Sequence, residues 1–229
     1  MLKKLLCIVL SFSMIFLFAS CSETEKETEP CVATVNGETI TTEEFEYFRK
    51  KYKAQVLNEC LEKYDADYTE NFWQTEFNGE TPEEILYKRV LKECAVAKIQ
   101  LLLMKEEGIY EDISFEGLKN KAETFNSENE NKENVVGIKS IQMSQFYSYY
   151  LQTGVMELQN IYSEGKLKPT DKEIQEKISA MTDELSSYQE QDYESIAKSR
   201  LKSEKYEKYI NELYEKAEIK EFEKDGKQS

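Results

Sequence analysis

The segment Val32–Phe48, VATVNGETITTEEFEYF, decides how the fold of this chain begins. Strand-forming residues stand on both sides of Asn36-Gly37. This dipeptide suits a two-residue type I′ turn, because both central residues of that turn need positive φ. We therefore predict a β-hairpin over Val32–Ile40.

A helix start follows the hairpin directly. Thr41 is placed as the N-cap, and Glu44, three residues later, as the partner that completes a capping box. Apolar rings then recur at spacings of three and four, at Phe45, Phe48 and Tyr52. This spacing predicts an amphipathic helix from about residue 42 to residue 63.

The first twenty residues are typical of an export signal. Lys3 and Lys4 precede an apolar run, Leu5–Ala19, that is too short for a comfortable membrane span. Leu17–Cys21, LFASC, resembles a lipobox, in which the cysteine carries acyl chains such as palmitate. We expect Cys21 to be lipidated and to hold the protein on the extracytoplasmic face of the cell membrane. The alternative is an ordinary signal peptide with an incidental cysteine.

The charge of the chain restricts its partners. The formal net charge is −15, and removal of residues 1–20, which contain two lysines and no acid, gives −17. A surface this acidic repels nucleic acid and anionic lipid headgroups, so neither is an expected partner. Residues 21–31, with glutamates at 23, 25, 27 and 29, are expected to form the lipidated tether.

The remainder is predicted to be a single helical domain, residues 32–222, followed by a polar tail, residues 223–229. The expected elements are a loop over 65–80, a helix from Thr81 to Gly108, a helix from Ser114 that ends in a polar loop over 126–134, helices over 144–165, 170–180 and 192–217, and a strand over 218–222. A hairpin alone is marginally stable in water, so we predict that this last strand pairs with it.

The opening motif resembles the start of the SurA N-terminal chaperone module, which PrsA-type foldase lipoproteins share. The recurring pattern V-A-x-V-N-G-x-x-I-T-x-x-E-F is matched from Val32 to Phe45, and Lys168–Ile174 resembles the x-P-T-D-x-E-I segment of the same family. The final helix and Ala217-Glu218-Ile219 resemble the family's closing segment. The resemblance implies a mainly α, trigger-factor-like chaperone module with a small β-hairpin and a C-terminal strand.

The resemblance also implies where an isomerase domain would stand, and that domain is not expected here. Parvulin active sites in the family are organised around paired histidines, and this chain has no histidine. Only Met181–Gln191 separates the expected helices, too few residues for an independent fold. We therefore predict no enzyme activity, no catalytic residues, no cofactor and no small-molecule substrate.

Metal and disulfide chemistry receive little support. Asp65–Glu76 has acids at some EF-hand positions, but Glu70 replaces the glycine that the sharp turn needs, so we predict no metal site. After export and lipidation Cys31, Cys60 and Cys94 remain. A Cys60–Cys94 disulfide and two separate buried thiols are both compatible with the spacing.

Aromatic residues are the remaining candidates for function. One interpretation is core packing. The other is a shallow groove for unfolded chains, in which rings give a large contact area at little entropic cost. The candidate client-binding residues are Phe72, Trp73, Phe77, Phe146, Tyr147, Tyr149 and Tyr150.

The expected function is therefore that of a membrane-anchored chaperone, a holdase or foldase, for unfolded or nascent exported polypeptides. One alternative is a scaffold lipoprotein that binds one folded partner in an envelope complex. Another is an active prolyl isomerase.

Overall fold

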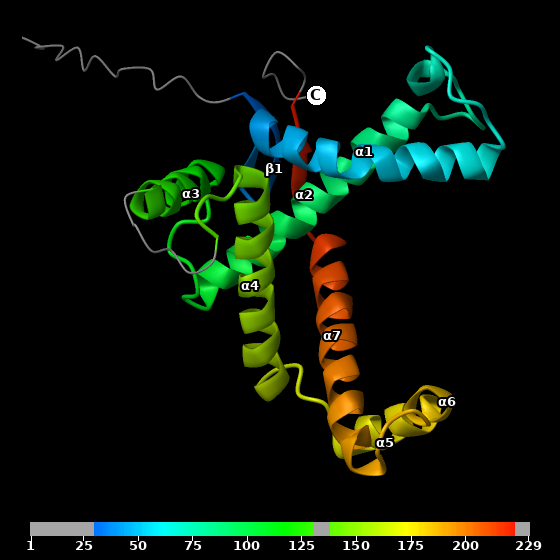
Figure 1. Cartoon of the computed structure of the whole chain (residues 1–229), viewed down its shortest axis with the longest axis vertical. Coiled ribbons are helices and arrows are strands. Elements are labelled where there is room, and N and C mark those ends of the chain that lie inside the picture. The colour runs from blue at the N-terminus through cyan, green and yellow to red at the C-terminus, as the bar shows by residue number, and fades with distance from the viewer. Residues whose placement is uncertain (1–29, 131–137, 223–229) are drawn as a thin grey trace, which may run out of the picture.

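The computed structural model describes residues 30–130 and 138–222, and in these ranges the chain is mainly helical with one three-stranded antiparallel sheet (Figure 1). The strands are β1 (Cys31–Val35), β2 (Glu38–Thr41) and β3 (Ile219–Glu221). The helices are α1 (Thr42–Tyr64), α2 (Pro82–Glu106), α3 (Phe115–Glu130), α4 (Met143–Glu164), α5 (Asp171–Ala180), α6 (Thr182–Leu185) and α7 (Tyr193–Tyr214), with 3-10 turns at Phe72–Gln74 and Glu190–Asp192. The predicted signal peptide, nearly all of the tether, and the polar tail lie outside the described residues.

The predicted hairpin is confirmed. Asn36 and Gly37 have φ values of 50° and 87°, and β1 pairs with β2 in antiparallel register on either side of them. Positive φ at both central positions is the requirement that selected Asn-Gly in the sequence.

The two ends of the domain meet, as predicted. The sheet order is β2-β1-β3, and Val35 pairs with Ile219. Beyond the ladder, the Asn36 N–H donates to the Glu218 carbonyl, and the Glu218 N–H donates to Asn36 Oδ1, both at 2.9 Å. The asparagine that forms the turn therefore also fastens the last strand to it.

Capping boxes start α2 and α5, where the sequence predicts helix starts. In each, the threonine hydroxyl accepts from the backbone N–H of the glutamate at the third helical position, whose carboxylate accepts from the N-cap N–H; the pairs are Thr81 with Glu84 and Thr170 with Glu173. Pro82 occupies the first helical position of α2, where a backbone N–H would have no partner within the helix, so the lack of an N–H costs no hydrogen bond.

At α1 half of the predicted box is wrong. Thr41 accepts from the Glu44 N–H at 3.1 Å, as expected. The Glu44 carboxylate does not complete a capping box, although the Thr41 backbone still acts to lower its pKa. It is fully buried and pairs with Lys98 of α2, so an ion pair in the core takes precedence over the local box.

The structure also adds the short helix α6, which was not predicted, and ends α7 at Tyr214, three residues before the predicted end at 217. Further differences lie around α3 and α4. α3 continues to Glu130, although the sequence predicts a loop from Asn126, and residues 131–134 of that loop lie outside the described residues. The Asn126 amide donates to the Ile141 carbonyl at 2.9 Å and accepts from its N–H at 2.8 Å, which ties α3 to the start of α4. α4 begins at Met143 after a Gln142 cap, one residue earlier than predicted.

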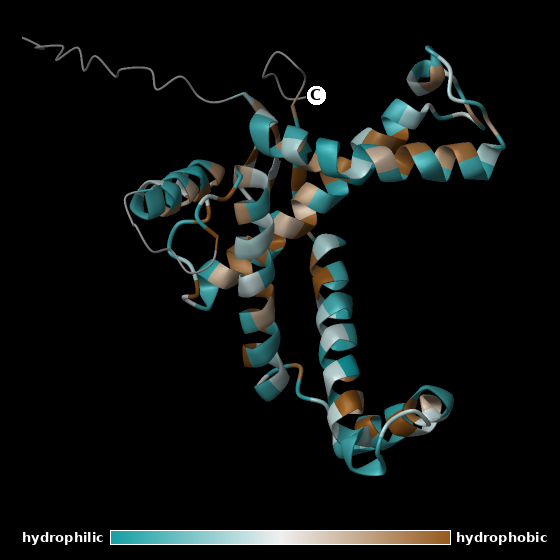
Figure 2. Cartoon of the chain, viewed as in Figure 1, coloured by the Kyte–Doolittle hydropathy of each residue, from teal (hydrophilic) through white to brown (hydrophobic). Residues whose placement is uncertain are grey.

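α2 lies at the centre of the fold, and two groups of helices extend from it. α1 and α2 pair along one arm, while α4 and α7 extend away from α2 side by side, with α5 and α6 at their far end (Figure 1). Apolar residues concentrate where these helices meet α2 (Figure 2), whose Leu86, Val90, Leu101 and Met104 are fully buried. Within the described ranges, no helix has both the length and the apolar character needed to cross a membrane.

Candidate functional site

A buried polar network joins the three central helices. Glu44 of α1, Lys98 of α2 and Tyr147 of α4 are each at most 1 % exposed. Lys98 Nζ lies 2.9 Å from Glu44 Oε2, and the Tyr147 hydroxyl donates to Glu44 Oε1 at 2.8 Å. We call these three residues the core pin, because they come from three different helices and meet at the Glu44 carboxylate.

Burial dominates the electrostatics of the core pin. Desolvation raises the pKa of Glu44 above its ordinary value, and the Lys98 ammonium, the Tyr147 hydroxyl and the Thr41 backbone act against that rise. Desolvation and the neighbouring Glu44 carboxylate raise the pKa of Tyr147 well above its ordinary value. Desolvation likewise raises the pKa of Cys94, which therefore remains a thiol. The core pin is thus closed to solvent and suited to holding helices in place.

A groove lies directly outside the core pin, between α1 and α4. It has an outer region of about 690 Å³ and an inner region of about 400 Å³, and the two regions share four lining residues, Tyr47, Lys51, Ser148 and Gln152. Volumes of this size are typical of ligand-binding clefts. Tyr147 contributes to the lining of the inner region, so the core pin supports the groove from below.

The lining of the α1–α4 groove is aromatic and neutral-polar. Its rings are Tyr47, Phe48, Tyr147 and Tyr149. Its uncharged polar side chains are Gln100, Ser144, Gln145, Ser148 and Gln152, and its remaining members are Leu151, Val155, Lys50 and Lys51. The Tyr47 hydroxyl and the Ser148 hydroxyl lie 2.7 Å apart, which bridges the two walls.

Two of the predicted client-binding aromatics lie in the core and do not line this groove. Phe72 is fully buried and Trp73 is 8 % exposed, in the loop that joins α1 to α2. Their ring centroids are 5.8 Å apart, and Phe77 packs on Phe72 and stacks on Tyr64. The prediction that this cluster lines an exposed surface is wrong for Phe72 and Trp73. Their rings are buried in the apolar core at the end where the loop joins α1 to α2.

The second predicted cluster is divided between the core and the surface. Tyr147 and Tyr150 are buried, and Tyr150 stacks on Tyr110 at 3.8 Å, so neither presents an exposed ring. Phe146 is half-buried against Tyr150. Tyr149 is 64 % exposed and lines the groove. Of the seven candidates, Tyr149 therefore has the position that a binding surface requires.

Sequence reasoning missed Tyr47, Lys50 and Lys51. A usable signal was present, because Phe45, Phe48 and Tyr52 define the inner face of α1. Lys50 and Lys51 lie off that face, and both are exposed. What no local pattern could show is that α4, about a hundred residues later, lies beside this part of α1.

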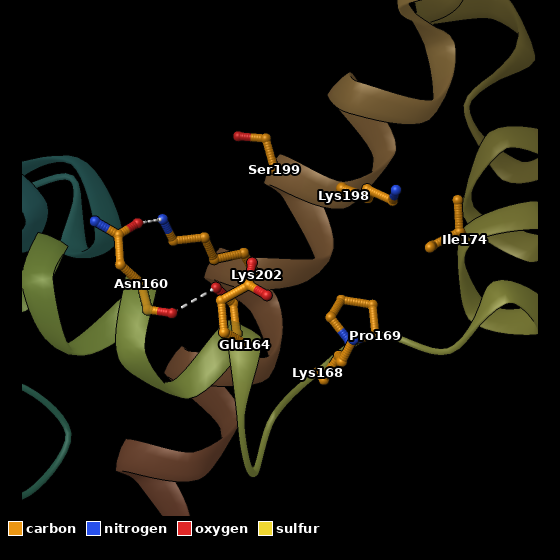
Figure 3. A pocket seen from close by; sticks show the side chains of 9 residues that line it. Asn160, Glu164, Lys168, Pro169, Ile174, Lys198, Ser199 and Lys202 are labelled. Atoms are coloured by element: carbon orange, nitrogen blue, oxygen red, sulfur yellow. Dashed lines mark hydrogen bonds between the residues drawn. The ribbon is translucent and has the colours of Figure 1, made fainter.

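A second cavity, of about 480 Å³, lies where α4, α5 and α7 meet (Figure 3). Its lining carries both signs of charge, with Glu164 beside Lys168, Lys198 and Lys202. Lys202 donates to the Asn160 side-chain carbonyl, and the neighbouring Ser163 hydroxyl donates to the Asn160 backbone carbonyl at 3.0 Å. This cavity is mainly polar and lacks the aromatic walls of the α1–α4 groove.

Cysteine and metal chemistry are limited in the described residues. Cys31, Cys60 and Cys94 are free thiols, so the Cys60–Cys94 disulfide that the spacing allowed is not formed. In residues 30–130 and 138–222, no group of three or more His, Cys, Asp or Glu side chains is arranged to hold a metal ion.

No family model matches the chain, and no curated protein or solved structure is significantly similar to it.

Proposed function

We propose that this protein is a membrane-anchored extracytoplasmic chaperone that binds unfolded exported polypeptides and has no catalytic isomerase domain. The observation that carries the proposal is the aromatic α1–α4 groove, open to solvent and supported by a buried ion pair. The lipobox-like Leu17–Cys21 and the motifs at Val32–Phe45 and Lys168–Ile174 favour the same interpretation.

The groove offers two kinds of contact to an extended chain. Tyr47 and Tyr149 present rings that contact apolar side chains over a large area at little entropic cost. Ser144, Gln145 and Gln152 offer hydroxyl and amide groups to the peptide backbone. Neither kind depends on one particular sequence, and binding of this kind suppresses aggregation by mass action without nucleotide.

The chain between α5 and α7 supports a non-catalytic role. Met181–Gln191 contains α6 and the beginning of a 3-10 turn, where the family that the motifs resemble carries its isomerase domain. The 229-residue sequence has no histidine. The proposed activity is therefore binding alone.

Suppression of aggregation tests the proposal. Light scattering would follow the dilution of a chemically denatured, unrelated protein into buffer with and without the mature chain. We expect suppression, and we expect it to weaken in Tyr149→Ser. Tyr68→Ser is the matched control, because Tyr68 is 63 % exposed but lies in the loop after α1, away from the groove. Absence of suppression by the unsubstituted chain, or equal losses in both variants, would contradict the proposal.

A further inference from the structure

The α1–α4 groove contains no acidic side chain. Asp and Glu make up 45 of the 229 residues, about one in five, so thirteen lining positions would be expected to include two or three. The thirteen residues that line the groove include none, and they include two lysines, Lys50 and Lys51. An acidic protein therefore has a groove whose own formal charge is positive.

Both lysines are available to a ligand. Lys50 and Lys51 are exposed, and within the described residues neither forms an ion pair. The neighbouring Arg49 is different, because it donates to Glu83 at 2.7 Å and lies 3.7 Å from Glu46. Lys51 Nζ lies 5.9 Å from the centroid of the Phe48 ring and 5.3 Å from that of Tyr52. This ammonium group is thus held next to the aromatic wall.

We infer that the groove selects extended polypeptide segments in which apolar residues stand next to Asp or Glu. The inference rests on the proposed function and names the class of segment that the groove prefers. Tyr47 and Tyr149 contact the apolar side chains, while Lys50 and Lys51 pair with the carboxylates. In an extended segment successive side chains point to opposite sides, so a segment with alternating apolar and acidic residues can turn its apolar side chains towards the rings and its carboxylates towards the exposed ammonium groups.

The net negative charge of the whole protein works against the binding of acidic segments. The mature chain has a formal charge of −17, which on its own favours basic peptides. At about 0.15 M salt the Debye length is about 8 Å, so distant charges are largely screened and adjacent lysines are not. A preference for acidic segments would therefore come from the groove and would oppose the overall field.

Peptide binding tests the inference. Three fluorescein-labelled peptides share one apolar pattern, with cores Leu-Glu-Phe-Glu-Leu, Leu-Gln-Phe-Gln-Leu and Leu-Lys-Phe-Lys-Leu. Fluorescence anisotropy at about 0.15 M salt would measure their affinities for the mature chain carrying Cys21→Ser. Two exposed ion pairs predict that the acidic peptide binds about fivefold more tightly than the Gln peptide. The Lys peptide should bind most weakly.

A charge reversal with a matched control locates the effect. Lys50→Glu/Lys51→Glu should invert the order of the three peptides. Lys172→Glu/Lys208→Glu makes the same change in net charge at side chains that are 84 % and 80 % exposed on α5 and α7, and it should preserve the order. Circular dichroism would show that both variants keep their helical content.

The possible outcomes separate the two proposals. The inference would be overturned, and the chaperone role would remain, if the chain suppresses aggregation but binds the three peptides equally well. The same conclusion would follow if both double variants change the peptide affinities equally. Absence of both suppression and peptide binding would overturn both. Self-association of the chain that Lys50→Glu/Lys51→Glu abolishes would identify a second copy as the occupant. Tighter peptide binding after replacement of the glutamates at 23, 25, 27 and 29 by glutamine would identify the tether. Either result would overturn the inference.

Discussion

Replacement of Lys98 by methionine is the most direct test of the core pin. The change keeps a long apolar side chain between α1, α2 and α4 but leaves the Glu44 carboxylate, which is fully buried, without its ammonium partner. An isolated buried carboxylate takes up a proton, because burial penalises the charged form. Lys98→Met should therefore convert an ion pair into a neutral acid that still accepts a hydrogen bond from Tyr147.

The expected loss of stability in Lys98→Met follows from the free energy needed to keep Glu44 protonated. An ordinary glutamate has a pKa of 4.5, so holding it protonated at pH 7 costs about 3.4 kcal/mol at 1.36 kcal/mol per pH unit. This agrees with the range of about 3–5 kcal/mol for breaking a buried pair by removing one partner. It is a large fraction of the total stability of about 5–15 kcal/mol that a typical protein has.

The dependence on pH distinguishes this mechanism from a simple packing loss. A carboxyl whose pKa is raised on folding binds more protons in the folded state, so stability falls as pH rises from 4.5 towards the folded pKa. Burial already raises the pKa of Glu44 in the parent, and the loss of Lys98 widens that window. Lys98→Met should therefore have a lower free energy of unfolding than the parent. Above pH 5, this difference should grow by up to about 1.4 kcal/mol per pH unit.

Urea unfolding at several pH values, followed by circular dichroism, measures these effects. Glu44→Gln/Lys98→Met should recover part of the loss and remove the added pH dependence, because no buried acid remains and glutamine still accepts from Tyr147. Lys172→Met, at a side chain that is 84 % exposed, should change stability by less than about 0.5 kcal/mol. A Lys98→Met protein within 1 kcal/mol of the parent at pH 7, with a parallel pH profile, would refute this account of the core pin.

Three further predictions concern the anchor, the chain ends and a surface carboxylate. Cys21→Ala should release the protein from membranes or block its maturation, and unchanged fractionation and mass would contradict lipidation at this residue. Truncation after Ala217 removes β3 together with the half-buried side chains of Ile219 and Phe222, and it should lower stability by about 3 kcal/mol. The melting temperature should then decrease by roughly 10 °C. An equal melting temperature would show that the ends are independent. Lys205 and the Thr170 backbone lower the pKa of Glu173 to about 2, so its contribution to stability is present above pH 4.5 and is lost as pH falls towards 2. The stability difference between the parent and Glu173→Gln should shrink over that range, and a constant difference would contradict it.

Most of the parts of the fold that the sequence predicted are set by short-range rules, and the pairing of the two chain ends is the exception. Asn36-Gly37 needs only its own φ preferences to form the turn, and Thr81, Pro82 and Glu84 start α2 within a single helical turn. The meeting of β1 and β3 followed from a simple physical need, because neither the hairpin nor the last strand has enough partners alone.

The parts that the sequence did not predict depend on contacts between distant residues. Glu44 satisfies the local rule for a capping box, yet its carboxylate contacts Lys98, 54 residues later in the chain, and the tertiary contact prevails. The aromatic candidates fail for the same reason. Tyr147 and Tyr149 are two residues apart and chemically alike, and the orientation of α4 against α2 decides that one is buried and the other exposed.

That orientation is fixed at two points on α4, and the position of the groove follows from them. Tyr147 is held by the Glu44 carboxylate, and two turns later Gly154 allows the helix to approach α2 closely. A Cβ atom at Gly154 would lie 2.4 Å from Met104 Sδ and 2.8 Å from Tyr110 Cε2, so this face of α4 tolerates no larger residue without movement. Successive residues of an α-helix are rotated by about 100°, and a slip of one residue would turn Tyr149 away from Tyr47. The buried ion pair and the glycine therefore act together to keep the ring of Tyr149 in the groove.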